Sequence, residues 1–467
     1  MRSMKTMWKP LALGVSAWWL GGCMVGPDYQ LPDSAPITLA SAHAEQFTGV
    51  AVPQPWWQLL QDPALSARVE QALAGNLSVQ QVQATLVAAE AVVDERRRDR
   101  YPAVTAGAEY QRGRSQQVSG GPRQRYGHQQ AGLHMAWELD LFGRLARGRN
   151  AAAAHRDAVA AELDQARLSL AAEVARSYYQ ARGLRQQLRV LAQEQRSWQQ
   201  ALAWREQQAV LGAGSPEQQA QIAVELAAVE AQRPPLIAAL QQAENRLAVL
   251  TGVPPGQAGP VAETAPAAPG ALQLPLGDVD QLLRNRPDVR RAERQLASRT
   301  EQVGAATAEL YPRLDLSGMI GVFALRGSDL GRSTRAHALT PTLSWPALDW
   351  GSVKARVRVA EAQADQAERA YQQQLLIAQE ELEAALNGLA AAQQQLDATL
   401  RAAHHSGDVQ RMVQARYQAG SALWLEVLDS ERALHRLQRQ AVAADTASWL
   451  QVVALYQALA WGLPPAG

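Results

Sequence analysis

The chain has 467 residues, of which 47% are hydrophobic but only 6% are aromatic, and its formal net charge is +1. The length allows two or three ordinary domains, whereas the shortage of aromatic side chains favours extended helical packing over thick layered cores. The near-neutral charge argues against a nucleic-acid-binding protein, because such proteins need clustered positive charge to neutralise phosphates.

The first residues have the pattern of a bacterial lipoprotein signal. Basic residues precede a short apolar segment that ends in Leu20-Gly21-Gly22-Cys23, and this cysteine is the only one in the chain. The apolar segment is too short to span a bilayer, and small residues before a cysteine resemble a lipobox. Residues 1–22 are therefore predicted to be a lipoprotein signal peptide, with acylation of the thiol and amine of Cys23. Met24 stands where an inner-membrane retention signal would have aspartate, which favours the outer membrane.

The next segments predict a tether and a first structural repeat. Residues 23–62 are rich in proline and small polar residues and are expected to form a lipidated extended tether. The first repeat spans residues 63–251. Alternating segments at about 103–111 and 130–138 predict a hairpin, and each is long enough for a tilted membrane strand. An uninterrupted helical pattern follows at 144–211.

The same order of elements then returns. A linker rich in proline, alanine and glycine occupies residues 252–277. The second repeat spans 278–467, with strands predicted at about 313–323 and 339–345 and a long helix at 352–418. Three pairs of landmarks recur in the two halves: Tyr101 and Tyr311, Trp137 and Trp345, and Gly214 and Gly420. This recurrence indicates duplication.

The second long helix has the apolar seam of a coiled coil. Its leucines are three, four or seven residues apart, as at the a and d positions of heptads: Leu375, Leu382, Leu386, Leu389, Leu396 and Leu400. At about 1.5 Å per residue, such a helix is roughly 100 Å long, too long for an ordinary globular domain. Gly420 is expected to end it in a left-handed conformation.

Four strands per chain cannot close a membrane barrel, since known barrels begin at about eight strands. An open sheet edge is forbidden in lipid because its backbone groups would be left without hydrogen bonds. The chain must therefore share one barrel with copies of itself. The strand count alone permits two, three or four copies.

Several motifs support a specific resemblance: the lipobox followed by Val25-Gly26-Pro27-Asp28-Tyr29, the duplicated strand-strand-helix order, Arg286-Pro287-Asp288-Val289, and the run Arg416-Tyr417, Gly420, Leu425 and Val427-Leu428-Asp429. Together they resemble the TolC-type outer-membrane factor family, in particular the lipoprotein branch of outer-membrane channels that serve RND-type drug-efflux pumps. The resemblance covers essentially the whole chain from Cys23. It implies a mainly α-helical fold with a membrane β-barrel: a homotrimer whose 12-stranded barrel stands on a long α-helical periplasmic tunnel.

The resemblance also implies a function. The chain would be the outer-membrane channel of a tripartite efflux pump, a passive gated conduit that exports drugs or other small toxic molecules. Its partners would be a periplasmic adaptor protein, an inner-membrane proton-driven RND-type transporter and outer-membrane lipid, with no nucleic acid. Two alternatives stay open: the outer-membrane component of a protein-secretion system, and a structural coiled-coil periplasmic lipoprotein without a pore.

In the family the gate lies just after the second helical turn, which here corresponds to Leu425, Asp429 and Arg432. Spacings of four and three residues place Leu425 beside Asp429, and Asp429 beside Arg432, on one helix face. Three symmetry copies of Asp429 near an axis would repel one another or recruit cations, and three copies of Leu425 would form an apolar constriction. The alternative is an exposed Asp429–Arg432 ion pair worth a few tenths of a kcal/mol, with no role in gating.

Further residues are assigned by their position near the turns. Arg416 and Tyr417 are possible gate-locking contacts. Gly214 and Ser215 in the first repeat, and Gly420 and Ser421 in the second, are expected at the hairpin tips that contact the adaptor. The first-repeat turn lacks the aspartate-bearing pattern associated with the family, which leaves its part in the gate open.

Nothing in the sequence predicts an enzyme, because no metalloprotease, serine-hydrolase, P-loop or dinucleotide motif occurs. No metal site and no cofactor are expected apart from the lipid on Cys23. The adjacent residues His404 and His405 are interpreted as a poor chelate, since neighbouring positions on a helix point in different directions.

Overall fold

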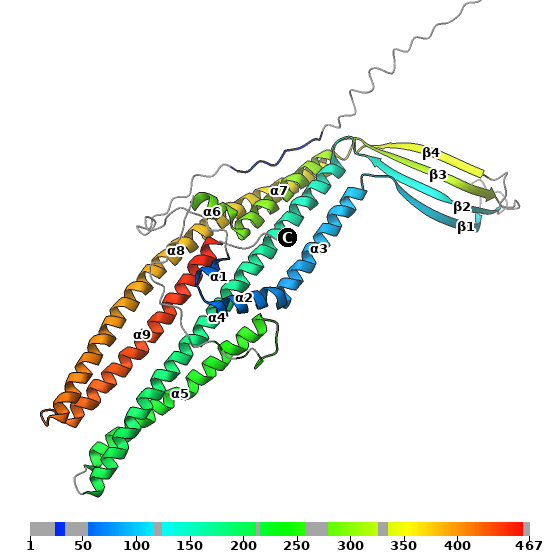
Figure 1. Ribbon diagram of the computed structural model, residues 1–467. Coiled ribbons are helices and arrows are strands. Elements are labelled where there is room, and N and C mark those ends of the chain that lie inside the picture. Colours follow the sequence, from blue (N-terminus) through cyan, green and yellow to red (C-terminus); the bar gives the residue numbers. More distant parts are fainter. Residues whose placement is uncertain are drawn as a thin grey trace, which may run out of the picture. The chain divides into compact units, whose positions relative to one another are not determined.

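The computed structural model describes residues 24–32, 55–115, 124–211, 215–257, 259, 261, 279–325 and 335–460. The described chain is mainly helical, with one sheet (Figure 1). The helices are α1 (Trp56–Leu59), α2 (Pro63–Gly75), α3 (Leu77–Arg98), α4 (Arg144–Val210), α5 (Pro216–Leu250), α6 (Val279–Asn285), α7 (Pro287–Ala308), α8 (Trp350–Gln418) and α9 (Trp424–Leu459). The strands are β1 (Ala103–Ser115), β2 (Gln124–Leu139), β3 (Arg313–Leu325) and β4 (Arg335–Ser344).

The order of elements is the same in both halves of the chain: a helix, two strands, a very long helix and a shorter helix. The long helices α4 and α8 have 67 and 69 residues, where the sequence predicts helices at 144–211 and 352–418. All four strands continue farther into the hairpin loops than the predicted segments of alternating polarity, because antiparallel pairing persists there. In the described part of the chain, none of the helices is long and apolar enough to cross a membrane.

The sheet has the order β1-β2-β3-β4, and every neighbouring pair is antiparallel. Its central pairing, β2 with β3, joins the two repeats. Gly132 faces Gly321 there, and a Cβ on Gly132 would lie 2.6 Å from the carbonyl oxygen of Ile320. The two glycines therefore allow the close backbone approach at the join.

The strands β1 and β4 are the two edges of this sheet. Pro341 lies in β4, which is where a residue without a backbone N–H is tolerated, and the sequence predicts an edge or a bulge at this position. Large apolar side chains are exposed on the sheet, among them Val104, Leu133, Ile320, Leu339 and Leu343. An edge that lacks a partner and an exposed apolar surface both call for further contacts.

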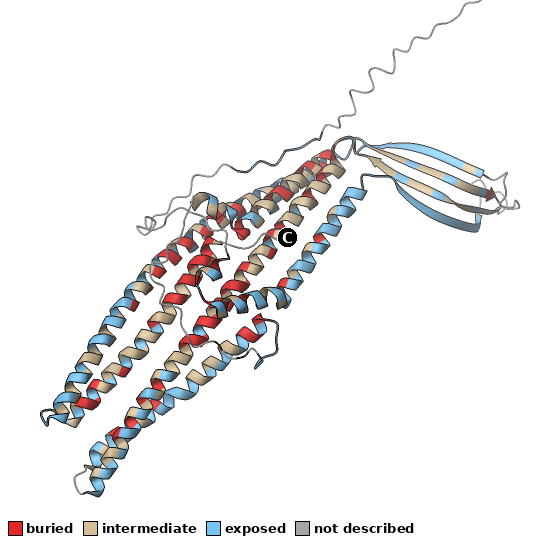
Figure 2. Cartoon of the chain, in the orientation of Figure 1, coloured by how far each residue is buried: buried red, intermediate tan, exposed pale blue. Residues whose placement is uncertain are grey.

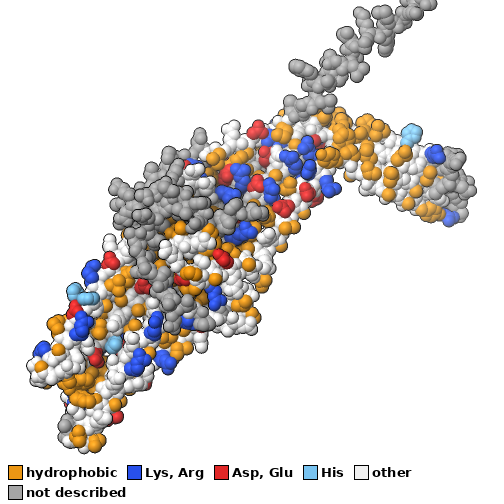
Figure 3. Space-filling view, viewed as in Figure 1, with side chains coloured by type: hydrophobic (Ala, Val, Ile, Leu, Met, Phe, Trp, Pro, Cys, Tyr) orange, Lys and Arg blue, Asp and Glu red, His pale blue; other side chains and the backbone are white. Residues whose placement is uncertain are grey.

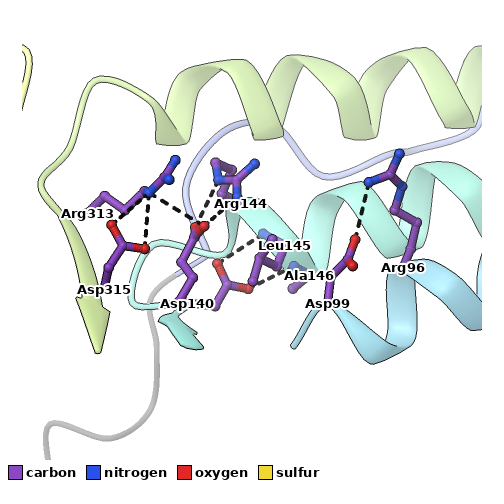
Figure 4. Close-up of polar contacts among 9 residues, drawn as sticks. Arg96, Asp99, Asp140, Arg144, Leu145, Ala146, Arg313 and Asp315 are labelled. Carbon is purple, nitrogen blue, oxygen red and sulfur yellow. Dashed lines mark hydrogen bonds and ion pairs between the residues drawn. The ribbon is translucent and has the colours of Figure 1, made fainter. Parts of the chain in front are cut away.

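The turn from β2 into α4 is held by side chains of its own (Figure 4). The Asp140 carboxylate accepts hydrogen bonds from the backbone N–H groups of Leu145 and Ala146, at 3.0 and 2.8 Å, and so caps the first turn of the helix. Arg144 donates to Glu138 at 2.5 Å, and Arg313 at the start of β3 lies 3.6 Å from the same carboxylate. The Asp-Gly turn thus ties the end of β2 to the start of α4 and to β3.

The described residues form two compact units. One takes its residues from 1–33, 85–160 and 291–372 and contains all four strands; the other takes them from 34–84, 161–290 and 373–467. In the second unit the tryptophans after the tether are buried, as the sequence predicts for residues that dock on a folded body. Trp56 stacks on Tyr456 of α9 with ring centroids 5.5 Å apart, and Trp57 is 2% exposed. Figure 2 marks the buried residues of these helices in red.

The Arg286-Pro287-Asp288-Val289 motif forms a buried polar network in the second unit. Arg286 is 4% exposed. Its guanidinium donates to Asp288 at 2.7 Å, to Glu381 of α8 at 2.5 Å and to the carbonyl oxygen of Ala458 in α9 at 2.8 Å. One arginine thereby links the start of α7 to both helices of the second hairpin. Pro287 occupies the first position of α7, where its missing N–H costs nothing.

A second buried arginine, in the first unit, holds the segment that follows the predicted lipid site. The side chain of Arg147 is 1% exposed and donates to the carbonyl oxygens of Val25 and Gly26, both at 3.2 Å. It also pairs with Asp28 at 2.8 Å and with Glu301 at 3.2 Å. Gly26 has φ +87°, and a Cβ on it would lie 2.5 Å from Gly304 Cα. The contacts with α4 and α7 therefore explain the glycine and the aspartate of the Val-Gly-Pro-Asp motif.

We expect Arg147→Ala to release residues 24–32 from the first unit. Removing one partner of a buried ion pair leaves Glu301 with an uncompensated charge and costs about 3 kcal/mol. Hydrogen exchange of the backbone amides in residues 24–32 should become faster. Arg156→Ala is the matched control, because Arg156 is a half-exposed residue of the same helix that pairs only with its neighbour Asp157. Unchanged exchange in Arg147→Ala would contradict the anchoring role.

Candidate functional site

The turn between α8 and α9 has the geometry predicted for Gly420. Its φ is +71°, its N–H donates to the Tyr417 carbonyl, and the N–H of Ser421 donates to the Arg416 carbonyl, both at 2.9 Å. These two bonds form a Schellman motif, which satisfies the last carbonyl groups of a helix and needs a left-handed residue, usually glycine. The predicted left-handed cap at Gly420 is confirmed.

The side chain of Arg416 makes its polar contacts within the same hairpin. Its guanidinium donates to the Ser421 carbonyl at 3.0 Å and lies 3.6 Å from the Glu426 carboxylate. Glu426 also accepts from the N–H of Leu423 at 3.0 Å and so caps the start of α9. Arg416 therefore braces the turn itself, and its part in locking a gate stays a prediction.

Tyr417 lies in an aromatic cluster that joins the two helical hairpins. Its ring centroid is 5.2 Å from that of Trp424 in α9 and 6.3 Å from that of Trp204 in α4, and the two tryptophans are 5.0 Å apart. The guanidinium of Arg205 lies 4.9 Å from the Trp204 ring. Aromatic and cation–π contacts of this kind contribute about 0.5–1.5 kcal/mol each. Tyr417 thus takes part in interhelical packing, and its part in locking a gate stays a prediction.

The three predicted gate residues share one face of α9. Leu425 is 55% exposed, and the Asp429 side chain, one turn later, is 60% exposed. Arg432 lies 3.3 Å from Asp429 and 2.9 Å from Glu225 of α5, and its guanidinium lies 5.8 Å from the Trp198 ring of α4. The predicted adjacency of Asp429 and Arg432 is present. Leu425 and the Asp429 carboxylate, which pairs with Arg432, are exposed and can make further contacts.

Arg432 has partners in the first hairpin that the sequence does not predict. Glu225 and Trp198 lie about two hundred positions away along the chain, and no periodic pattern connects them with Arg432. One indication of such contacts is present in the sequence: tryptophans occur near the turns, although aromatic residues are rare in this chain. The hairpins also share a hydrophobic cluster of buried residues: Leu191, Trp198, Ala201, Ile222, Val229 and Leu428.

The remaining predicted positions are only partly described. Ser215 precedes α5, and its carbonyl accepts from the N–H of Gln219 at 3.2 Å. Gly214 lies outside the described residues, as does Cys23, so lipidation of Cys23 stays a prediction. Ser421 donates its hydroxyl to the Arg416 carbonyl at 3.1 Å.

Two titratable groups lie in or next to the predicted gate segment of α9: Glu431 is partly buried, and His435, about one turn after Arg432, is buried. Burial raises the pKa of the Glu431 carboxyl above its ordinary range. Burial also lowers the pKa of His435 below its ordinary value of 6.5, and this outweighs the opposite effect of its contact with Gln438. In both cases the charged form is disfavoured because it loses hydration.

Long helices that pack through a shared core, together with a four-stranded sheet that has two free edges, are also the fold of known outer-membrane channels. The sequence profile described as "Outer membrane efflux protein" matches residues 69–253 and 279–460. The chain therefore belongs to the outer membrane efflux protein family.

Individual relatives agree with this assignment. The chain is 31% identical to outer membrane protein OprJ of Pseudomonas aeruginosa, with 98% of this chain and 97% of OprJ covered. It is 29% identical to the probable efflux pump outer membrane protein TtgC of Pseudomonas putida, with 97% and 95% covered. Among solved structures, the outer-membrane channel OprN superposes with a TM-score of 0.87 at 36% identity, over 94% of this chain and 99% of that one.

These findings confirm the TolC-type family, the fold class and the efflux role predicted from the sequence. The protein is an outer-membrane efflux channel, in a family of transport proteins. Membership of an efflux family favours this function over the two alternatives, protein secretion and a spacer without a pore.

The shifted pKa of His435 predicts a pH dependence. The unfolded state binds a proton to this histidine more readily than the folded state. The folded state therefore loses stability as the pH falls below about 6.5. We expect the thermal midpoint of the helices, followed by circular dichroism between pH 8 and pH 5, to fall less steeply in His435→Gln than in the native protein. Glu431 acts in the opposite direction but is common to both proteins.

The control for this comparison is His155→Gln, since His155 is an exposed residue of α4. Its curve should follow that of the native protein. Parallel curves for His435→Gln and the native protein would show that burial of His435 does not couple folding to pH.

Proposed function

We propose that the protein is the outer-membrane duct of a tripartite pump, and that it works as a lipid-anchored homotrimer. The duct would be docked to a periplasmic adaptor and to an inner-membrane RND-type transporter. The observation that carries this proposal is the four-stranded sheet with two unpaired edges, in a chain that belongs to the outer membrane efflux proteins. Energy for export would come from the transporter, because the duct has no catalytic role in this scheme.

The sheet supports assembly through its edges. Strands β1 and β4 each offer a row of backbone groups that need partners in a membrane. Pairing of β4 in one chain with β1 in the next would satisfy both rows. Three chains of four strands would give a closed 12-stranded barrel, within the range of known outer-membrane barrels.

The second hairpin supports a gate at its tip. Leu425 and Asp429 project from α9 with about half or more of their surfaces exposed, and Arg432 is held by Glu225 and Asp429. In a trimer these residues would form an apolar ring and an acidic ring about the axis. Rings of acidic side chains select or retain cations, and apolar constrictions close a pore by excluding water.

The substrates proposed are drugs and other small toxic molecules.

The adaptor would contact the hairpin tips at Ser215, Gly420 and Ser421, together with Gly214. Exposed apolar side chains lie beside the tips and would be covered in that contact: Val210 and Leu211 at the end of α4, and Leu423 at the start of α9. Large exposed apolar groups of this kind are typical of interaction surfaces.

Single-channel recording tests the gate. In planar bilayers, the double variant Leu425→Ala with Asp429→Ala should conduct severalfold more than the native protein, because it lacks both the apolar and the acidic ring. Divalent cations should reduce the native current and leave the variant current unchanged. Leu400→Ala with Asp397→Ala is the matched control, since it removes the same two side-chain types from exposed positions of α8.

The control should conduct like the native protein. If the Leu425 and Asp429 variant has native conductance and native cation sensitivity, neither residue belongs to the gate. If both double variants conduct more, the effect reflects general loosening of the hairpins and the gate assignment fails.

A further inference from the structure

Three metal-binding side chains lie together on α8, away from the residues considered so far. His404, His405 and Asp408 each offer one ligand atom, and these atoms all lie within 4.8 Å of one another. No other group of three or more such side chains lies within this reach in the described ranges. The histidine side chains are 74% and 77% exposed, and that of Asp408 is 35% exposed. Figure 3 shows histidine side chains in pale blue at the molecular surface.

The sequence predicts that the two histidines alone are a poor chelate, and the structure places a third residue, Asp408, beside them. Adjacent positions are about 100° apart around a helix, so the two rings diverge. Their planes meet at 88°, with centroids 5.9 Å apart. Asp408 follows one turn later and lies angularly between them. Its Oδ2 atom is 3.3 Å from Nδ1 of His404 and 3.9 Å from Nδ1 of His405.

The two oxygens of the Asp408 carboxylate have different partners. Its Oδ1 atom accepts a short hydrogen bond from Arg411, one turn farther along α8. Its Oδ2 atom faces the two histidines. A carboxylate that is held on one oxygen keeps the other oriented for a ligand, as partners outside the coordination shell do in metal sites.

We propose that His404, His405 and Asp408 form a binding site for a late first-row transition-metal dication of the Zn²⁺ type. Imidazole nitrogen and carboxylate oxygen are ligands that zinc accepts, at about 2.0–2.2 Å. Tetrahedral geometry at those lengths places ligand atoms roughly 3.4 Å apart, close to the separations in the structure. Three protein ligands on an exposed face leave the fourth position to water.

Because Gly407 lies within the site, metal binding would affect the stability of α8. Gly407 lies between the ligands in the sequence, and a glycine inside a helix is destabilising by about 1 kcal/mol relative to alanine. A Cβ built on Gly407 would lie 3.8 Å from both Leu434 of α9 and Arg411, so Gly407 lies beside the partner helix, whereas the side chains of His404 and His405 are largely exposed. A metal that joins positions 404 and 408 spans this weak turn of α8. Because it binds the folded helix, the metal stabilises that helix.

Isothermal titration calorimetry of the full-length, detergent-extracted protein tests the site. After removal of bound metals with a chelator, zinc chloride is the probe. One saturable zinc site per chain is expected in the native protein. His404→Ala, His405→Ala and Asp408→Asn should each lose that saturable step. All three side chains are on the surface of the helix, so the helical circular dichroism of the variants should match that of the native protein.

The matched control is His155→Ala, which removes one exposed histidine of α4 that belongs to no such group. It should keep the saturable step. As a second readout, zinc should raise the thermal midpoint of the native protein and of His155→Ala, but not that of His404→Ala with His405→Ala. The proposal is overturned if the native protein takes up no zinc, if the double variant binds as the native protein does, or if every histidine variant loses an equal part of the uptake.

Discussion

The structure depends first on the need of every backbone polar group for a hydrogen-bond partner. A four-stranded sheet satisfies its inner strands and leaves β1 and β4 with one free edge each. Water can satisfy such an edge, whereas the hydrocarbon of a membrane cannot. A chain of this family, placed in the outer membrane, must therefore find its missing partners in other copies of itself. The two repeats meet this constraint jointly: each supplies one hairpin, and the Gly132–Gly321 contact lets the two hairpins pair closely.

Long helices need fixed points along their length, and in this chain two buried arginines supply them. Arg286 joins α7 to α8 and α9 in the second unit, and Arg147 joins the segment at residues 25–28 to α4 and α7 in the first. Each guanidinium is almost completely buried and has several acceptors. Arginine suits this role because it stays charged and has five donors in a fixed plane. The polar contacts of these arginines thereby explain the Val-Gly-Pro-Asp and Arg-Pro-Asp-Val motifs of the sequence.

Features that depend on local and periodic signals could be predicted from the sequence. The α8 helix and the left-handed glycine at its end depend on contacts a few residues apart. Five of the six leucines of the predicted seam are buried, whereas Leu400 is 48% exposed, so the buried seam ends at Leu396. Features that depend on distant partners could not be predicted. The pairing of Arg432 with Glu225, and the packing of Tyr417 against Trp204, bring together helices from different repeats. The proposed metal site is a different case, because Asp408 lies one turn from His404 and the three residues are close together in the sequence as well as in space.

The central claim is that β4 of one chain pairs with β1 of the next, and disulfide cross-linking tests it most directly. The only native cysteine is Cys23. Cysteines can therefore be introduced at Thr105 of β1 together with Ala336, Ala338 or Thr340 of β4, which lie on the same face of the sheet as Thr105 and cover neighbouring registers. Within one chain, two intervening strands keep these edges roughly 14 Å apart, beyond the reach of a disulfide. The account predicts that oxidation gives covalent oligomers of up to three chains for at least one pair and none for single-cysteine variants. Monomers alone, for every pair in the membrane-inserted protein, would contradict it.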